Sequence, residues 1–117
     1  PVNLTTATSA NVTSISLTAG DWDVWGNLFV LPDTTTNVTI AQGGISSTTA
    51  TLPTLVSVGI VNYGAAGVVP STVGFNYQVP GYRLSLSATT TIYLVANVAF
   101  SLSTCQAGGA IYARRRR

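Results

Sequence analysis

An alternation of side chains between Leu17 and Leu31 constrains the fold more than any other feature of this sequence. Successive residues of a β-strand point to opposite faces, so this run divides into two sets. The first set is apolar and predicts a core face: Trp22, Val24, Leu28 and Val30, with Gly26 between them. The second set mixes polar and aromatic residues: Asp23, Trp25, Asn27, Phe29 and Leu31. A strand with apolar residues on both faces lies centrally in a sandwich or presses against another subunit.

The composition favours strands along the whole chain. Glu, Lys and Met, which are common in helices, are absent, whereas Val, Thr, Ile and aromatic residues are plentiful. Short apolar or alternating segments recur at intervals of about ten residues, and none has a helical pattern. The sequence therefore predicts one all-β domain, a β-sandwich or jelly roll of about eight short antiparallel strands.

Turn-forming residues set the expected boundaries. We expect strands over residues 12–18, 21–31, 37–41, 55–61, 73–79, 82–87, 91–102 and 110–113. We expect turns at residues 19–20, 32–34, 42–44, 80–81, 88–90 and 106–109. Residues 45–53 and 62–70 are expected to be surface loops. Because loops on a rigid β-scaffold carry recognition, these two are the expected contact surfaces, while the receptor itself is unknown.

The chain has few charges. Charged residues make up 7% of it, against about 25% in ordinary globular proteins, and the mean hydropathy is +0.41. A small soluble monomer normally depends on surface charge to stay dispersed. We therefore expect an obligate oligomer that buries apolar surface between copies. The sequence contains no run of about 18 apolar residues, so we expect no transmembrane helix.

Most catalytic sites cannot be built from these residue types. The chain has no His, no Lys and no Glu, and Cys105 is its single cysteine. Ser-His-Asp, Cys-His and Ser-Lys sites are therefore excluded, as are His/Cys zinc sites and lysine-containing phosphate loops. We predict a protein that is not an enzyme, with no catalytic, cofactor-binding or metal-binding residue. Cys105 is expected to be a small buried side chain.

Two charged groups allow a functional alternative. Asp21 and Asp23 lie two residues apart on one strand, so their carboxylates point the same way about 7 Å apart. They could act as the two acids of a hydrolase or help to hold Ca²⁺, but the other ligands that such a site needs are missing. We therefore favour a structural interpretation, in which Asp21 is a turn residue and Asp23 is a solvated strand residue.

The arginine run 114–117 could contact phosphate, nucleic acid or acidic lipid. We favour arginines that cap an edge, line an oligomer axis or pair with a neighbouring subunit's Asp.

Aromatic residues allow a second alternative. Trp22, Trp25, Tyr63, Tyr77 and Tyr82 could form a platform on which sugars stack, although core and interface packing are commoner. A carbohydrate-binding β-sandwich module is therefore a competing hypothesis.

The beginning of the chain is polar and weakly patterned. Residues 1–12 are expected to be a lead-in from an upstream shaft, and residues 13–117 a single β-sandwich domain. Pro1 is not an initiator residue, so the chain is expected to be a processed product or a fragment.

Several segments resemble the tips of bacteriophage tail fibres and tail needles. They are Leu-Thr-Ala-Gly-Asp-Trp-Asp-Val at 17–24, Gly-Asn-Leu-Phe at 26–29, Arg-Leu-Ser-Leu-Ser at 83–87, Thr-Ile-Tyr-Leu-Val-Ala at 91–96, Phe-Ser at 100–101 and Gly-Ala-Ile-Tyr-Ala-Arg-Arg at 109–115. Together they cover about half of the chain. The closest resemblance is to the distal knob of the tail needle in short-tailed enteric phages.

The resemblance implies a fold and a role. The family's knob is a homotrimeric jelly roll similar to tumour necrosis factor and complement head domains. It would lie in the virion, at the end of a needle or fibre shaft, and contact the host cell surface or an outer-membrane component during attachment and genome ejection. The family has no catalytic motif, so the resemblance carries over no site residues, no cofactor and no nucleic-acid partner.

Overall fold

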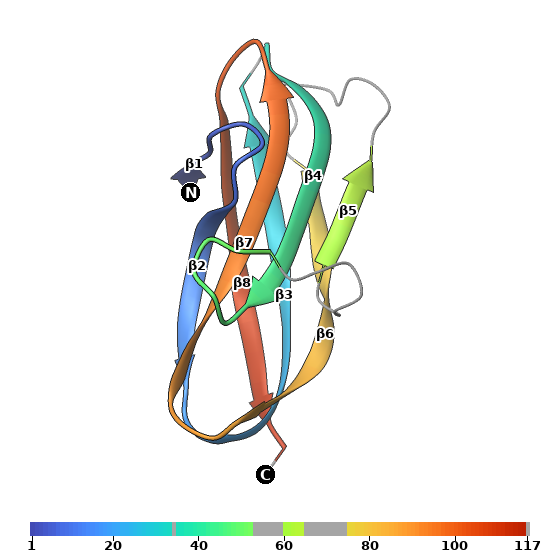
Figure 1. The fold of residues 1–117 in the computed structure, drawn as a ribbon. Helices are drawn as coiled ribbons and strands as arrows, with labels where there is room; N and C mark the ends of the chain where they lie inside the picture. Colours follow the sequence, from blue (N-terminus) through green and yellow to red (C-terminus); the bar gives the residue numbers. More distant parts are fainter. Residues whose placement is uncertain (34, 53–59, 65–74, 117) are drawn as a thin grey trace.

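The computed structural model describes residues 1–33, 35–52, 60–64 and 75–116, and their regular structure is entirely β-strand (Figure 1). The strands are β1 (Val2–Asn3), β2 (Ala10–Leu17), β3 (Gly20–Pro32), β4 (Asn37–Ser46), β5 (Ile60–Gly64), β6 (Phe75–Leu86), β7 (Thr90–Ser101) and β8 (Cys105–Arg115). They form two antiparallel four-stranded sheets: sheet I in the order β1-β8-β3-β6, and sheet II in the order β2-β7-β4-β5. The predicted all-β architecture is confirmed.

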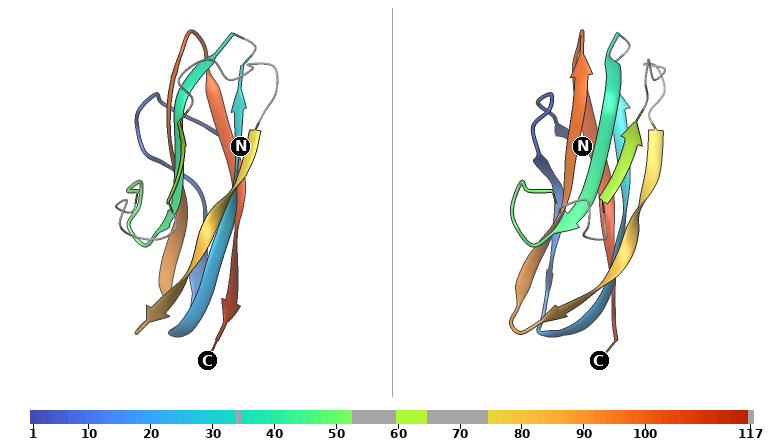
Figure 2. Two further views of the ribbon diagram at one scale, coloured as in Figure 1. Left: turned by 90° about the vertical axis from the view of Figure 1, so that its right-hand side faces the viewer. Right: turned by 45° about the vertical axis from the view of Figure 1, so that its right-hand side comes forward.

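The two sheets form the two layers of an elongated molecule of 46 × 23 × 20 Å, seen side by side in the left view of Figure 2. Apart from β4 and β5, consecutive strands belong to different sheets. Two crossings lie at the same end of the molecule: residues 18–19 join β2 to β3, and residues 87–89 join β6 to β7 (Figure 1). They lie close together because Leu17 pairs with Thr90 and Gly20 pairs with Leu86.

The core lies between the sheets and takes alternate residues from the long strands. Its most buried side chains on β3 and β7 are Val24, Leu28, Val30, Ile92, Leu94, Ala96 and Val98. Trp22 is partly buried and packs against this core. Burial of each Val or Leu side chain contributes about 1.5–3 kcal/mol. The core face predicted between Leu17 and Leu31 is confirmed.

The turn predicted at Pro80-Gly81 is wrong, because β6 runs through both residues. Val24 pairs with Tyr82 and Gly26 pairs with Val79, so two residues of β6 lie opposite one residue of β3. This arrangement is a β-bulge. Since β6 is the edge strand of sheet I, the missing N–H of the proline is tolerated there.

The turns predicted at residues 42–44 and 106–109 are also wrong, because β4 and β8 continue through them. The glycines there allow close packing rather than a change of direction. A Cβ added at Gly43 would lie 2.6 Å from Leu28 Cδ2. A Cβ added at Gly109 would collide with the carbonyl oxygen of Asn27 and lie 2.7 Å from Leu94 Cδ2. Glycine inside a strand often marks such a close approach.

The predicted loop 45–53 is shorter than expected. Ile45 is buried in the core and β4 ends at Ser46, so the exposed loop begins at residue 47. The strand predicted over 55–61 and the loop predicted over 62–70 lie largely outside the described residues. Their described part, residues 60–64, forms β5.

Residues 1–12 take part in both sheets. Val2 and Asn3 pair with Ala107 and Gln106 of β8, and Leu4 packs against the core. Residues 10–12 form the start of β2 in sheet II. The predicted lead-in therefore belongs to the sandwich in this structure, and the upstream shaft stays a prediction.

Candidate functional site: the outer face of sheet I

Aromatic side chains gather on the outer face of sheet I, between its two longest paired strands. Val24 and Leu28 of β3 point into the core, so Trp25 and Phe29 point outward. The register of β3 and β8 places Trp25 directly opposite Tyr112. Their rings stack with centroids 5.8 Å apart and planes inclined by 21°. Such offset aromatic pairs stabilise a sheet by about 0.5–1.5 kcal/mol beyond their buried area.

Small residues of β8 leave this face flat beyond the stacked pair. Phe29 is paired with Gly108, and Asn27 is paired with Ala110. No bulky side chain of β8 therefore rises beside Phe29, which remains 38% exposed, while Tyr112 is 48% exposed. We call the surface formed by Trp25, Phe29, Ala110 and Tyr112 the aromatic strip.

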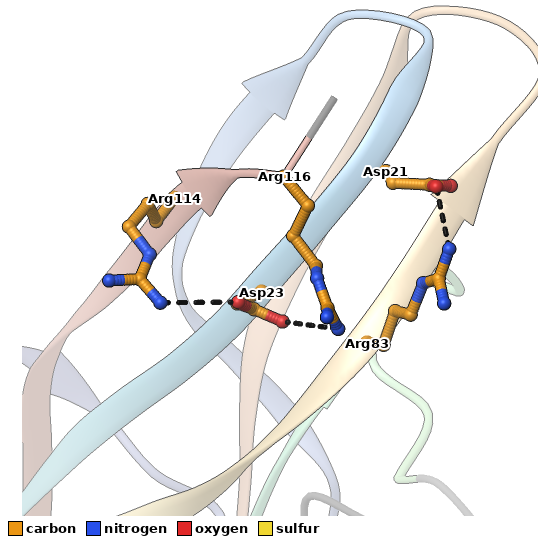
Figure 3. A network of polar contacts seen from close by, with 5 residues as sticks. All are labelled: Asp21, Asp23, Arg83, Arg114 and Arg116. Carbon is orange, nitrogen blue, oxygen red and sulfur yellow. Dashed lines mark hydrogen bonds and ion pairs between the residues drawn. The ribbon is translucent and has the colours of Figure 1, made fainter.

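An ion-pair cluster, drawn in Figure 3, lies at one end of the aromatic strip, because the pair Asp23–Arg114 follows the pair Trp25–Tyr112 along β3 and β8. Asp21 Oδ2 lies 2.6 Å from Nη2 of Arg83 on β6. Asp23 lies between two guanidinium groups, 3.5 Å from Arg114 Nη2 and 3.4 Å from Arg116 Nη1. Pairs as exposed as these stabilise a fold by about 0–1 kcal/mol each. Their position brings both signs of charge to the same end of this face.

Arg115 points to the other side of β8 and holds the crossing between β2 and β3. Its Nη1 donates to Thr18 Oγ1 and its Nη2 donates to the carbonyl oxygen of Ala19, each at 2.9 Å. The guanidinium carbon lies 5.4 Å from the ring centroid of Trp22, whose Nε1 donates to the Thr18 carbonyl at 2.9 Å. Arginine suits this place because its planar group stacks on a ring while it donates along its edge.

The chain's own loop after β4 crosses part of the outer face of sheet II. Val95 of β7 lies between the core residues Leu94 and Ala96, so it points outward, yet it is fully buried. Its neighbour Asn11 on β2 binds the loop that follows β4. Asn11 Nδ2 donates to Thr49 Oγ1 at 2.6 Å, and Asn11 Oδ1 accepts from the backbone N–H of Ala50 at 2.7 Å. Because β7 lies between β4 and β2, the loop crosses the outer face of β7 (Figures 1 and 2), where Asn11 is paired with Val95.

The structure places the predicted charged residues as follows. Asp21 and Asp23 share the outer face of β3, as expected, and each is bound to arginine. Within the described ranges, no group of three or more His, Cys, Asp or Glu side chains is placed to hold a metal ion. Arg114 and Arg116 pair with Asp23 of their own chain, and Arg117 lies outside the described residues.

Among the aromatic residues suggested for a sugar platform, Trp25 lies on the aromatic strip and Trp22 packs at the core. The side chains of Tyr63, Tyr77 and Tyr82 lie outside the described part. Sequence reasoning missed Tyr112. The alternation over residues 110–113 gives its face, but no sequence signal shows that it lies opposite Trp25.

Cys105 occupies a core position of β8, as predicted, and is 1% exposed. Burial raises the pKa of its thiol to about 11, although a hydrogen bond with the backbone of Gln106 lowers it in part. The thiol is therefore neutral at physiological pH and behaves as a small apolar side chain.

No helix among the residues placed by the structure is long and apolar enough to span a membrane. Comparisons of the chain with family models, with curated proteins and with solved structures find no match.

Proposed function

We propose that this protein is a non-catalytic virion component, the distal knob of a trimeric phage tail needle or tail fibre. It contacts the host cell envelope during attachment and genome ejection. Its partners are two further copies of itself, an upstream shaft and a host surface or outer-membrane component. The observation that carries the proposal is the pairing order of the eight described strands.

The pairing order supports a jelly roll of the tumour necrosis factor type. β1 pairs with β8, β2 with β7, β3 with β6, and β4 with β5. One long antiparallel ribbon, folded back between β4 and β5, makes these four pairs. Rolling that ribbon up adds the pairs β3–β8 and β4–β7, which are also present. An eight-stranded double-sheet jelly roll is expected to have this pairing order, which therefore supports the proposal.

The positions of the segments that resemble tail needle tips also support the proposal. Residues 20–29 lie in β3, residues 83–86 in β6 and residues 109–115 in β8, and these three strands are neighbours in sheet I. Residues 91–96 lie in β7, which pairs with the end of β2. Segments that are far apart in the sequence thus form one continuous region.

Native mass spectrometry combined with envelope binding tests the proposal. We expect a trimer, three times the chain mass of 12.1 kDa, that survives heating. We also expect the protein to sediment with bacterial outer-membrane vesicles and not with vesicles of purified phospholipid. A monomer would contradict the trimeric knob, and a trimer without vesicle binding would contradict the envelope contact.

A carbohydrate-binding module is the second candidate, and the stacked Trp25–Tyr112 pair favours it. Asp23 and Asn27 lie on the same face and could bind sugar hydroxyl groups while a pyranose ring packs on the aromatic pair. This candidate predicts a monomer or dimer with glycan affinity that Trp25→Ala abolishes. A blank result on a broad glycan array would remove it.

A further inference from the structure

The edge of β8 that faces away from β3 is open over much of its length. β1 covers only its beginning, opposite Gln106 and Ala107. Among the residues that the structure describes, no strand pairs with residues 109–113 on this side, which we call the open edge. Such an edge presents backbone N–H and C=O groups that can pair with another chain.

Alternate residues of β8 direct their backbone groups to the open edge. The carbonyl of Cys105 accepts from the N–H of Leu4, on the β1 side, at 2.9 Å. The N–H of Arg116 donates to the Asp21 carbonyl, on the β3 side, at 2.8 Å. Because successive residues of an antiparallel strand direct these groups to opposite sides, the odd-numbered residues face away from β3. On the open edge these residues are Gly109, Ile111 and Ala113.

The exposure of Gly109 shows that solvent reaches the open edge. A Cβ added at Gly109 would point into the core, 2.7 Å from Leu94 Cδ2, yet the residue is exposed. Glycine has no side chain, so the exposed atoms belong to its backbone. The neighbours Gly108 and Ala110 are small and leave room beside the strand.

The other edge strands among the described residues carry features that hinder pairing. β6 contains Pro80 and the bulge opposite β3, the register of β2 shifts between Asn11 and Thr13, and β5 has only five residues. Prolines, bulges and short length are usual means of protecting an edge. In contrast, β8 has no proline and pairs with β3 from Cys105 to Arg115 without a shift.

We propose that the open edge of β8 binds an extended segment of a partner protein, which adds to sheet I as an antiparallel strand in line with β1. β1 itself shows that a strand fits in this line. At about 3.3 Å per residue the open edge is about 17 Å long, and strand addition of this kind is a common way to bind peptides. The inference rests on the proposed envelope contact and specifies the host component as a protein segment.

The charge at the end of β8 favours an acidic segment. The five basic residues of the chain are Arg83 and the run 114–117, and two carboxylates, those of Asp21 and Asp23, pair with members of this set. Positive charge is therefore in excess here. The Arg114 side chain is 77% exposed and lies 3.5 Å from the Asp23 carboxylate, so its other donors can bind a carboxylate of the added strand.

The side chains of β8 indicate what the added strand should carry. Tyr112 and Arg114 lie two residues apart on the outer face of sheet I, whereas Ile111 and Ala113 pack against the core. Directly opposite side chains of paired strands lie about 4.5–5.5 Å apart. The added strand should therefore have an acidic residue opposite Arg114, an aromatic residue opposite Tyr112 and apolar residues at the alternate positions.

The acetylated and amidated peptide Thr-Asp-Val-Tyr-Val-Thr-Ser has this pattern and is the probe. We expect it to slow hydrogen exchange at the amides of Gly109, Ile111 and Ala113 at least about tenfold, measured by NMR. The matched control is the same peptide N-methylated at both valines, which lie opposite Ile111 and Ala113. It keeps every side chain and the charge but loses donors to the open edge, so it should not bind.

Ala113→Pro tests the same edge from the protein side. Proline there removes an N–H that faces the open edge and none that pairs with β3, so the fold should persist. We expect peptide binding to weaken at least about tenfold. Ala113→Ser keeps the N–H and should bind as the wild type does. The N-methylated peptide decides the question independently if Ala113→Pro does not fold.

The outcomes separate this inference from the proposed function. Amide protection by the peptide that is lost on N-methylation supports the edge site. Equal binding of both peptides, or of neither, overturns it, as do edge amides that are already protected at high protein concentration and lose protection on dilution, because a second copy then occupies the edge. Vesicle binding that Ala113→Pro leaves unchanged overturns the edge and keeps the envelope contact. Peptide binding without vesicle binding supports the edge site and overturns the envelope contact.

Discussion

The two outer faces of this sandwich differ in how exposed their outward apolar side chains are. Each has outward apolar side chains on a central strand: Val95 on β7 of sheet II, and Trp25 and Phe29 on β3 of sheet I. Val95 is fully buried on the face that the loop after β4 crosses, whereas Phe29 and Tyr112 of the aromatic strip stay partly in solvent. An outward apolar residue therefore does not by itself indicate an interface. Among the described residues, the two faces differ in whether a segment of the same chain crosses them.

The packing beneath the sheet I face gives the largest expected effect. A Cβ at Gly109 would collide with the Asn27 carbonyl and push β8 away from β3, so Gly109→Ala should destabilise the fold by about 3 kcal/mol. Gly108→Ala is the matched control, because the nearest atom to its Cβ would be Pro1 Cα at 4.0 Å. Urea unfolding of the two variants checks this. Equal unfolding midpoints for the two variants would show that β8 and β3 are not tightly packed at Gly109.

The buried thiol of Cys105, in the core between the two sheets, should make the free energy of unfolding depend on pH. The Cys105 thiol has its pKa raised from 9.0 to about 11 in the folded protein, so the unfolded chain loses this proton first. Stability from the neutral thiol is complete below pH 9 and is lost as the pH rises towards 11, by about 2–3 kcal/mol in all. The unfolding free energy of Cys105→Ala should fall less over the same range. Parallel pH curves would mean that the thiol is hydrated.

Removing the Asn11 side chain, which holds the loop after β4, should expose Val95 on the outer face of sheet II. Asn11→Ala deletes the two hydrogen bonds to Thr49 and Ala50, and we expect a loss of about 1–2 kcal/mol and exposure of Val95. Binding of a hydrophobic dye and the unfolding midpoint report the two effects. Ser16→Ala, at an exposed position of β2, is the control. Dye binding equal to wild type would show that the loop stays in place without Asn11.

The ion-pair cluster should have the smallest effect on the isolated fold. The Arg114 side chain is 77% exposed and its contact with Asp23 is 3.5 Å long, so Arg114→Gln should change stability by less than about 0.5 kcal/mol. Thermal unfolding at low and high salt measures it. A larger, salt-sensitive loss in the assembled protein than in the monomer would sharpen the comparison, because it would place Arg114 between subunits.

The alternation between Leu17 and Leu31 predicted the central strand because burial of one face imposes a period of two. Pro80-Gly81 misled because the same dipeptide suits a turn and an edge-strand bulge, and the difference depends on which strand is its neighbour. Gly43 and Gly109 misled because their reason is a side chain or carbonyl from another strand. These are long-range contacts, which no local pattern encodes.

The candidate site was predicted in part for the same reason. The outward positions of Trp25 and Phe29 follow from the period of β3, so the need for cover was visible in the sequence. The partner ring of Tyr112 depends on the register between β3 and β8. The path of the loop beside Val95 depends on the hydrogen bond between Asn11 and Thr49, which lie 38 residues apart in the sequence.

The mass of the native protein over a dilution series is the most direct test of the account. If the chain forms the proposed trimeric knob, the protein at micromolar concentration has three times the mass of the 12.1 kDa chain. A protein that stays monomeric at every concentration would contradict it.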